Sequence, residues 1–115
     1  MKLDLSIPPW SKPKPPGFPA KDPTEFLMPL YDAYAAGCVE NRKNDARLSP
    51  SFKSAEDLPR DLLLLVPAID ILLHEQLSFV ERLKRDLEKG RAGTGGRVES
   101  MVFENGFHGW LEGMC

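Results

Sequence analysis

The feature that most constrains the fold is an unbroken apolar run at residues 62–66, Leu-Leu-Leu-Leu-Val. No polar residue alternates with these side chains, which is the pattern of a strand covered on both faces in a parallel sheet. After this run the spacing of the apolar residues changes. They recur at intervals of four, three, three and four in the series Leu73, Leu77, Val80, Leu83 and Leu87. That spacing is typical of an amphipathic helix. The sequence therefore predicts a buried strand followed by an amphipathic helix.

A second strand is expected at residues 98–103, where apolar and polar residues alternate. Gly90 is a suitable end for the preceding helix, and residues 91–97 form a glycine-rich loop. The order strand, helix, strand implies two parallel strands joined by a right-handed crossover. A parallel sheet needs several strands and helices on both faces, and here only a short stub at residues 3–5 could add a strand. We therefore predict an α/β fold that is incomplete.

The first part of the chain is predicted to be an extended proline-rich segment followed by one helix. Seven prolines between residues 7 and 23 exclude regular hydrogen-bonded structure there. Residues 22–25, Asp-Pro-Thr-Glu, have the form of a helix start. Pro29 either kinks this helix or marks a second start. An apolar stripe, which can belong to a core or line a substrate site, then runs towards Gly37 through Phe26, Leu27, Leu30, Tyr31 and Tyr34.

Composition excludes several classes of protein. A length of 115 residues allows one domain. The formal net charge is −2 and both signs are interspersed, so the chain has no cluster of basic residues of the kind that binds nucleic acid. The two cysteines, Cys38 and Cys115, do not suggest a disulfide framework. The first residues show no secretory signal, so we expect a cytoplasmic protein. The longest apolar stretch, residues 62–73, is interrupted by Pro67 and Asp70 and is well short of the ~20 residues that cross a bilayer, so no membrane span is expected.

Two residues with complementary chemistry follow the two predicted strands. Asp70 comes just past the first strand, and His108 comes just past the second. Ligands of open α/β sheets bind at the carboxyl ends of the strands, where adjacent parallel strands would place this carboxylate beside this imidazole. A carboxylate that accepts from one ring nitrogen fixes the tautomer, and it stabilises the imidazolium formed when the other nitrogen takes a proton. Asp70 and His108 are therefore the candidate acid and base.

Three segments carry a resemblance to a known family. In residues 62–75 the apolar run is followed by the sequence Asp-Ile-Leu-Leu-His-Glu. Residues 107–110 are Phe-His-Gly-Trp, and residues 48–50 are Leu-Ser-Pro. They resemble the acid-bearing strand with its D-x-L-x-x-E turn, the H-G-F motif and the S-P segment of the α/β-hydrolase fold-3 family, which is related to hormone-sensitive lipase. Trp110 replaces the phenylalanine of that motif. The resemblance covers residues 3–110.

The resemblance implies an esterase or lipase fold in which Asp70 is the triad acid and His108 is the general base. Residues 1–47 would form a strand stub, the proline-rich segment and a cap-like helix over an acyl pocket. Residues 48–115 would form a strand-helix-strand-helix unit that carries the acid and the base. Family members hydrolyse carboxylic esters with a serine in a G-x-S-x-G motif and an oxyanion hole from an H-G-G motif, and neither motif occurs here. The resemblance therefore implies the C-terminal portion of a hydrolase that acts on a small-molecule ester when complete, with negligible activity for this chain alone.

Other roles stay open from the residues alone. Asp70 can be a helix cap, and His108 can be a loop residue. Residues 74–78, His-Glu-Gln-Leu-Ser, approximate the zinc motif H-E-x-x-H, yet Ser78 stands where the second ligand must be. The glycine-rich residues 90–97 lack the lysine and hydroxyl residue of a phosphate loop. We therefore expect no metal and no cofactor.

Three hypotheses describe the whole chain. The first is a truncated gene product, which we favour because Met1 falls inside what would be the tail of a strand. The second is a non-catalytic interaction module. The third is a complementing fragment that becomes active with a separate N-terminal chain. The oligomeric state is left open.

Overall fold

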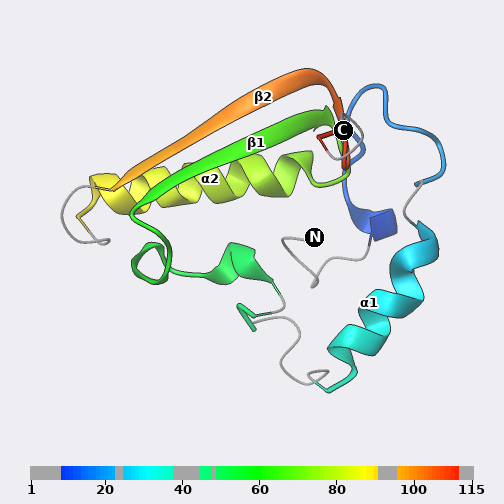
Figure 1. Ribbon diagram of the computed structural model, residues 1–115, viewed down its shortest axis with the longest axis horizontal. Helices are drawn as coiled ribbons and strands as arrows, with labels where there is room; N and C mark the ends of the chain where they lie inside the picture. Colours follow the sequence, from blue (N-terminus) through cyan, green and yellow to red (C-terminus); the bar gives the residue numbers. More distant parts are fainter. Residues whose placement is uncertain (1–8, 23–24, 38–44, 48, 91–95, 112–115) are drawn as a thin grey trace.

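The body of the protein is a small α/β layer made by two strands and one helix. The computed structural model describes residues 9–22, 25–37, 45–47, 49–90 and 96–111. Strands β1 (Asp61–Ile69) and β2 (Arg97–Phe107) pair in parallel, and helix α2 (Leu73–Glu88) connects them and lies along one face of the sheet (Figure 1). The predicted order and the parallel pairing are confirmed.

The core lies between α2 and one face of the sheet. Its buried apolar residues come from β1, from the turn that follows it and from α2, namely Val66, Ile71, Leu72, Phe79, Val80 and Leu83. On the opposite face, Leu63, Leu65 and Met101 are 56%, 41% and 52% exposed. The expectation that β1 is covered on both faces is therefore wrong for the described chain, because α2 covers one face only.

The register of the two strands changes near their carboxyl ends. From Asp61 to Pro67 each residue pairs with the residue 36 positions later (97 minus 61), whereas Ile69 pairs with Phe107, 38 positions later. Two extra residues of β2 are thus accommodated opposite the end of β1. Proline has no N–H to donate to a sheet ladder, so a break in the register next to Pro67 is physically reasonable. The shift brings His108 level with Asp70, since 108 minus 70 is also 38.

Helix α1 (Met28–Ala35) lies apart from this layer (Figure 1). A short 3-10 helix, η2 (Glu25–Leu27), precedes it, and Pro29 stands in the first turn of α1. Pro29 therefore marks a helix start and does not kink a longer helix. Phe26, Leu30 and Tyr34 are exposed, so these residues of the apolar stripe do not belong to a core of the described chain.

Short 3-10 helices complete the described chain: η1 (Pro9–Ser11), η4 (Pro50–Phe52) and η5 (Ala55–Asp57). The expectation of no regular structure in the proline-rich segment is wrong for η1, which is a single turn there. Residues 108–111 form a turn after β2. The predicted stub at residues 3–5, both cysteines and most of the glycine-rich loop lie outside the described residues, as does any helix beyond residue 111. Among the helices that the structure describes, none combines the length and the apolar character needed to span a bilayer.

Candidate active site

Asp70 ends β1 and begins the turn into α2. Its carbonyl accepts the N–H of Leu73, the first residue of α2, at 3.0 Å. Its Oδ1 accepts the N–H of Leu72 at 2.9 Å, a local bond that Asp side chains commonly form in turns. Only 2% of Asp70 is exposed. The N-cap residue is Leu72, so Asp70 organises the helix start from two positions before the cap, with one carboxylate oxygen held by the backbone.

His108 lies in a tight turn directly after β2. The N–H of Trp110 donates to the carbonyl of Phe107 at 3.0 Å, which closes a four-residue turn. Gly109 occupies the third position with a φ of +76°, the backbone conformation that a type II turn requires there and that glycine adopts without strain. The turn therefore places His108 at its second position, beside the end of β1.

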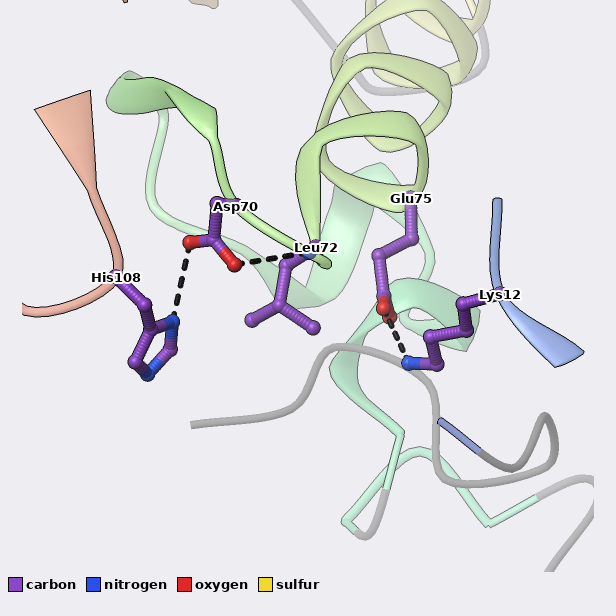
Figure 2. A network of polar contacts seen from close by, with 5 residues as sticks. All are labelled: Lys12, Asp70, Leu72, Glu75 and His108. Carbon is purple, nitrogen blue, oxygen red and sulfur yellow. Dashed lines mark hydrogen bonds and ion pairs between the residues drawn. The ribbon is translucent and has the colours of Figure 1, made fainter. Parts of the chain in front are cut away.

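The side chains of the two candidate residues are in hydrogen-bond contact: the Nδ1 of His108 lies 3.0 Å from the Oδ2 of Asp70 (Figure 2). A carboxylate can only accept, so Nδ1 carries the proton and donates it to Asp70. In neutral His108 the lone pair is then on Nε2, which points away from Asp70 in Figure 2. One carboxylate oxygen of Asp70 therefore bonds the turn before α2, and the other contacts the imidazole of His108. Asp70 is not the helix cap, because the N-cap residue is Leu72.

The environment of His108 favours its protonated form. The hydrogen bond to Asp70 raises the pKa of His108 above the ordinary 6.5, and the negative charges of Asp70 and, more weakly, Asp22 act in the same direction. Burial opposes them by disfavouring the charged ring. The His108 side chain is still 39% exposed. An oriented imidazole with a raised pKa and partial access to solvent is suited to accept a proton and to return it.

Gly106, which sequence reasoning missed, packs where the strand register shifts. It is buried, and a Cβ atom there would lie 3.1 Å from the Cβ of Pro67, 3.1 Å from the Nε1 of Trp110 and 3.2 Å from the Cβ of Phe103. The rings of Phe103 and Trp110 are also in contact, with centroids 4.8 Å apart. The absence of a side chain at position 106 therefore allows β1, β2 and the His108 turn to approach closely.

Replacing Gly106 with Ala is expected to destabilise the protein by about 1–3 kcal/mol, because the new methyl group overpacks a site bounded by three residues. Urea denaturation followed by circular dichroism measures this change. Gly37→Ala is the matched control, since a Cβ at Gly37 meets no heavy atom within 4 Å. A loss for Gly106→Ala no larger than that of the control would contradict the close packing at the register shift.

A partly buried ion pair lies beside the turn between β1 and α2. The ammonium of Lys12 pairs with Glu75, which belongs to the first turn of α2 (Figure 2). Lys12 lies in the proline-rich segment, and no local pattern marks it. Among the residues that the structure describes, no three or more His, Cys, Asp and Glu side chains lie close enough together to hold a metal ion.

A groove of about 550 Å³ opens beside this ion pair. Its apolar wall includes Phe52, Ile71 and Phe79, and neither Asp70 nor His108 lines it. The acid-base pair is therefore not part of this groove.

Comparisons with known proteins identify no relative. No protein-family model, no curated protein and no solved structure matches the chain. The resemblance to α/β-hydrolases therefore remains a prediction, and the contact between Asp70 and His108 is the structural observation that bears on it.

Proposed function

We propose that this chain is the C-terminal part of a serine-dependent carboxylic ester hydrolase of the α/β-hydrolase fold-3 type. Asp70 would be the triad acid, and His108 the general base. The observation that carries the proposal is the 3.0 Å contact between the Oδ2 of Asp70 and the Nδ1 of His108, at the carboxyl ends of two adjacent parallel strands. Ligand sites of open α/β sheets lie at that edge.

The proposed chemistry divides between this chain and a segment that supplies the nucleophile. The Nε2 of His108 would take the proton of an attacking serine and later give it to the leaving alcohol, while Asp70 holds the ring and stabilises the imidazolium. The serine and the oxyanion donors must come from elsewhere, since the sequence has neither G-x-S-x-G nor H-G-G. In subtilisin, loss of the nucleophile alone costs on the order of a million-fold in rate, so the isolated chain should be almost inactive.

The sheet face opposite α2 is exposed within the part of the chain that the structure describes, and this supports the proposal of an incomplete fold. Parallel sheets normally have both faces covered, yet Leu63, Leu65 and Met101 are exposed opposite α2. Further strands and helices of a complete hydrolase would bury these side chains. In the same proposal η2 and α1, with the exposed residues Phe26 and Leu30, contribute to the cap over an acyl pocket. We also propose that the complete protein is cytoplasmic.

An extended chain tests this function directly. The genomic frame upstream of Met1 is read for G-x-S-x-G and H-G-G motifs, and the extended protein is assayed with a short-chain aryl ester. We expect ester hydrolysis by the extended protein, its loss in His108→Ala, and nearly full activity in His74→Ala, which removes the other histidine of this chain. If no such motifs precede the chain, and no separate N-terminal hydrolase fragment restores activity on mixing, the hydrolase proposal is wrong.

The exposed apolar surfaces also fit a non-catalytic interaction module. Leu63 and Leu65 on the sheet and Phe26 on the α1 side are available for contact with another protein. This alternative predicts that the chain melts cooperatively alone and binds a defined partner without any ester hydrolysis. The extended-chain assay separates the two functions, because only a hydrolase requires His108.

A further inference from the structure

The ion pair between Lys12 and Glu75 joins two distant parts of the chain at the site. Lys12 follows η1 and is 6% exposed, while the Glu75 side chain is 13% exposed. The two residues are 63 positions apart in the sequence. Removing two such charges from water is unfavourable unless they stay paired, so the pair should hold the N-terminal segment against the first turn of α2.

That first turn is bonded directly to the turn that carries Asp70. The Asp70 side chain accepts the N–H of Leu72, and its carbonyl accepts the N–H of Leu73. The carbonyl of Leu72 in turn accepts the N–H of Gln76, the neighbour of Glu75, at 2.9 Å. Consecutive hydrogen bonds therefore connect Gln76, which follows Glu75 in the chain, to the carboxylate that contacts His108. Figure 2 shows the ion pair and the acid-base contact on either side of Leu72.

We propose, building on the function above, that Lys12 and Glu75 are positioning residues for the acid-base pair. Their ion pair keeps the first turn of α2 in place, and this turn keeps the Oδ2 of Asp70 within hydrogen-bond distance of the Nδ1 of His108. Neither residue touches the reacting atoms. The pair acts through the backbone between Asp70 and Gln76.

The proposal is tested on the full chain by nuclear magnetic resonance, with two readouts that need no substrate. The first is the pH titration of the His108 ring. The second is hydrogen exchange of the Leu72 amide, which reports its bond to Asp70, relative to the amide of Leu83 in the middle of α2. The variants are Lys12→Met, Glu75→Gln and the reversed pair Lys12→Glu with Glu75→Lys. Neither Asp70 nor Asp22, the carboxylates that favour protonated His108, is changed in any of them.

We expect Lys12→Met and Glu75→Gln to lower the pKa of His108 towards its ordinary value and to speed exchange at Leu72 by about tenfold, the signature of local opening. The reversed pair should restore both readouts. Asp86→Asn is the matched control, because it removes the ion pair between Arg82 and Asp86 further along α2 and should change neither readout.

A folded Lys12→Met or Glu75→Gln variant with unchanged titration and unchanged Leu72 exchange would overturn the proposal. If both variants unfold, Glu75→Asp decides in their place, because it keeps both charges and shortens one side chain: a shift in both readouts supports the positioning role, and no shift overturns it. Absence of ester hydrolysis by the extended protein would remove the proposed function and leave these measurements valid. The two proposals therefore fail separately.

Discussion

Replacing Asp70 with Asn is expected to lower the kcat of the proposed complete hydrolase by about four orders of magnitude, as the equivalent change does in serine protease triads. Asn can still accept the N–H of Leu72, so the start of α2 should survive. Its amide would face the Nδ1 of His108 as a donor. The imidazole would then carry its proton on Nε2, which removes the lone pair that accepts the proton of the serine.

The same substitution has a second consequence that can be measured in the isolated chain. In the wild type, the raised pKa of His108 contributes stability that is fully present below the unfolded value of 6.5 and is lost as the pH rises through the folded pKa. Asp70→Asn removes the main cause of the rise and leaves burial, which lowers the pKa of His108. The sign then reverses, so stability is lost as the pH falls through 6.5.

Urea denaturation from about pH 5 to about pH 9 measures this reversal. Asp57→Asn is the control, since Asp57 is exposed and distant in sequence from His108, and it should keep the pH profile of the wild type. An Asp70→Asn variant with the wild-type profile would show that Asp70 does not control His108 in solution. A complete enzyme whose kcat falls by less than about tenfold would show that the pair is not part of a triad.

The arrangement of the site could be predicted from sequence because its main elements follow from local patterns. The change of period after residue 66 separates β1 from α2, and the strand-helix-strand order implies parallel pairing. Asp70 and His108 were placed together for a general reason, since residues that directly follow adjacent parallel strands lie at one edge of the sheet. The catalytic roles of the two residues remain a prediction.

Features that depend on packing between distant residues could not be predicted. The register shift between Pro67 and Ile69 depends on how closely Gly106 approaches the opposite strand, and a glycine in a strand does not reveal its neighbours. Nothing in the sequence indicates that β2 accommodates two residues more than β1 between the pairs Pro67–Phe103 and Ile69–Phe107.

The partner of Glu75 and the exposed face of β1 were missed for related reasons. A lysine in a proline-rich segment gives no sign that it will be buried, because its partner is 63 positions away. An unbroken apolar run predicts a strand that can be covered on both faces, yet it does not say whether this chain supplies both covers. Leu63 and Leu65 are apolar residues of the kind usually found in a protein interior, yet they are exposed.

Leu83→Ala is expected to destabilise the chain by about 2–5 kcal/mol, the usual cost of removing a buried leucine side chain and leaving a cavity. Leu83 is 1% exposed and lies on the face of α2 that packs against the sheet, in a core that also includes Val66 and Val80. Because small domains are stable by only about 5–15 kcal/mol in total, this single change should remove a large part of the stability. Urea denaturation followed by circular dichroism measures it.

The neighbouring substitution Lys84→Ala is the control, because Lys84 is exposed on the same helix and should change stability by no more than about 0.5 kcal/mol. A small effect of Leu83→Ala would mean that α2 is not firmly packed on the sheet in the isolated chain. Asp70 and His108 would then also lack a fixed geometry, since the turn from β1 into α2 positions the acid. A large effect would show that this one-sided core is sufficient to hold α2 on the sheet, and with it the turn that carries Asp70.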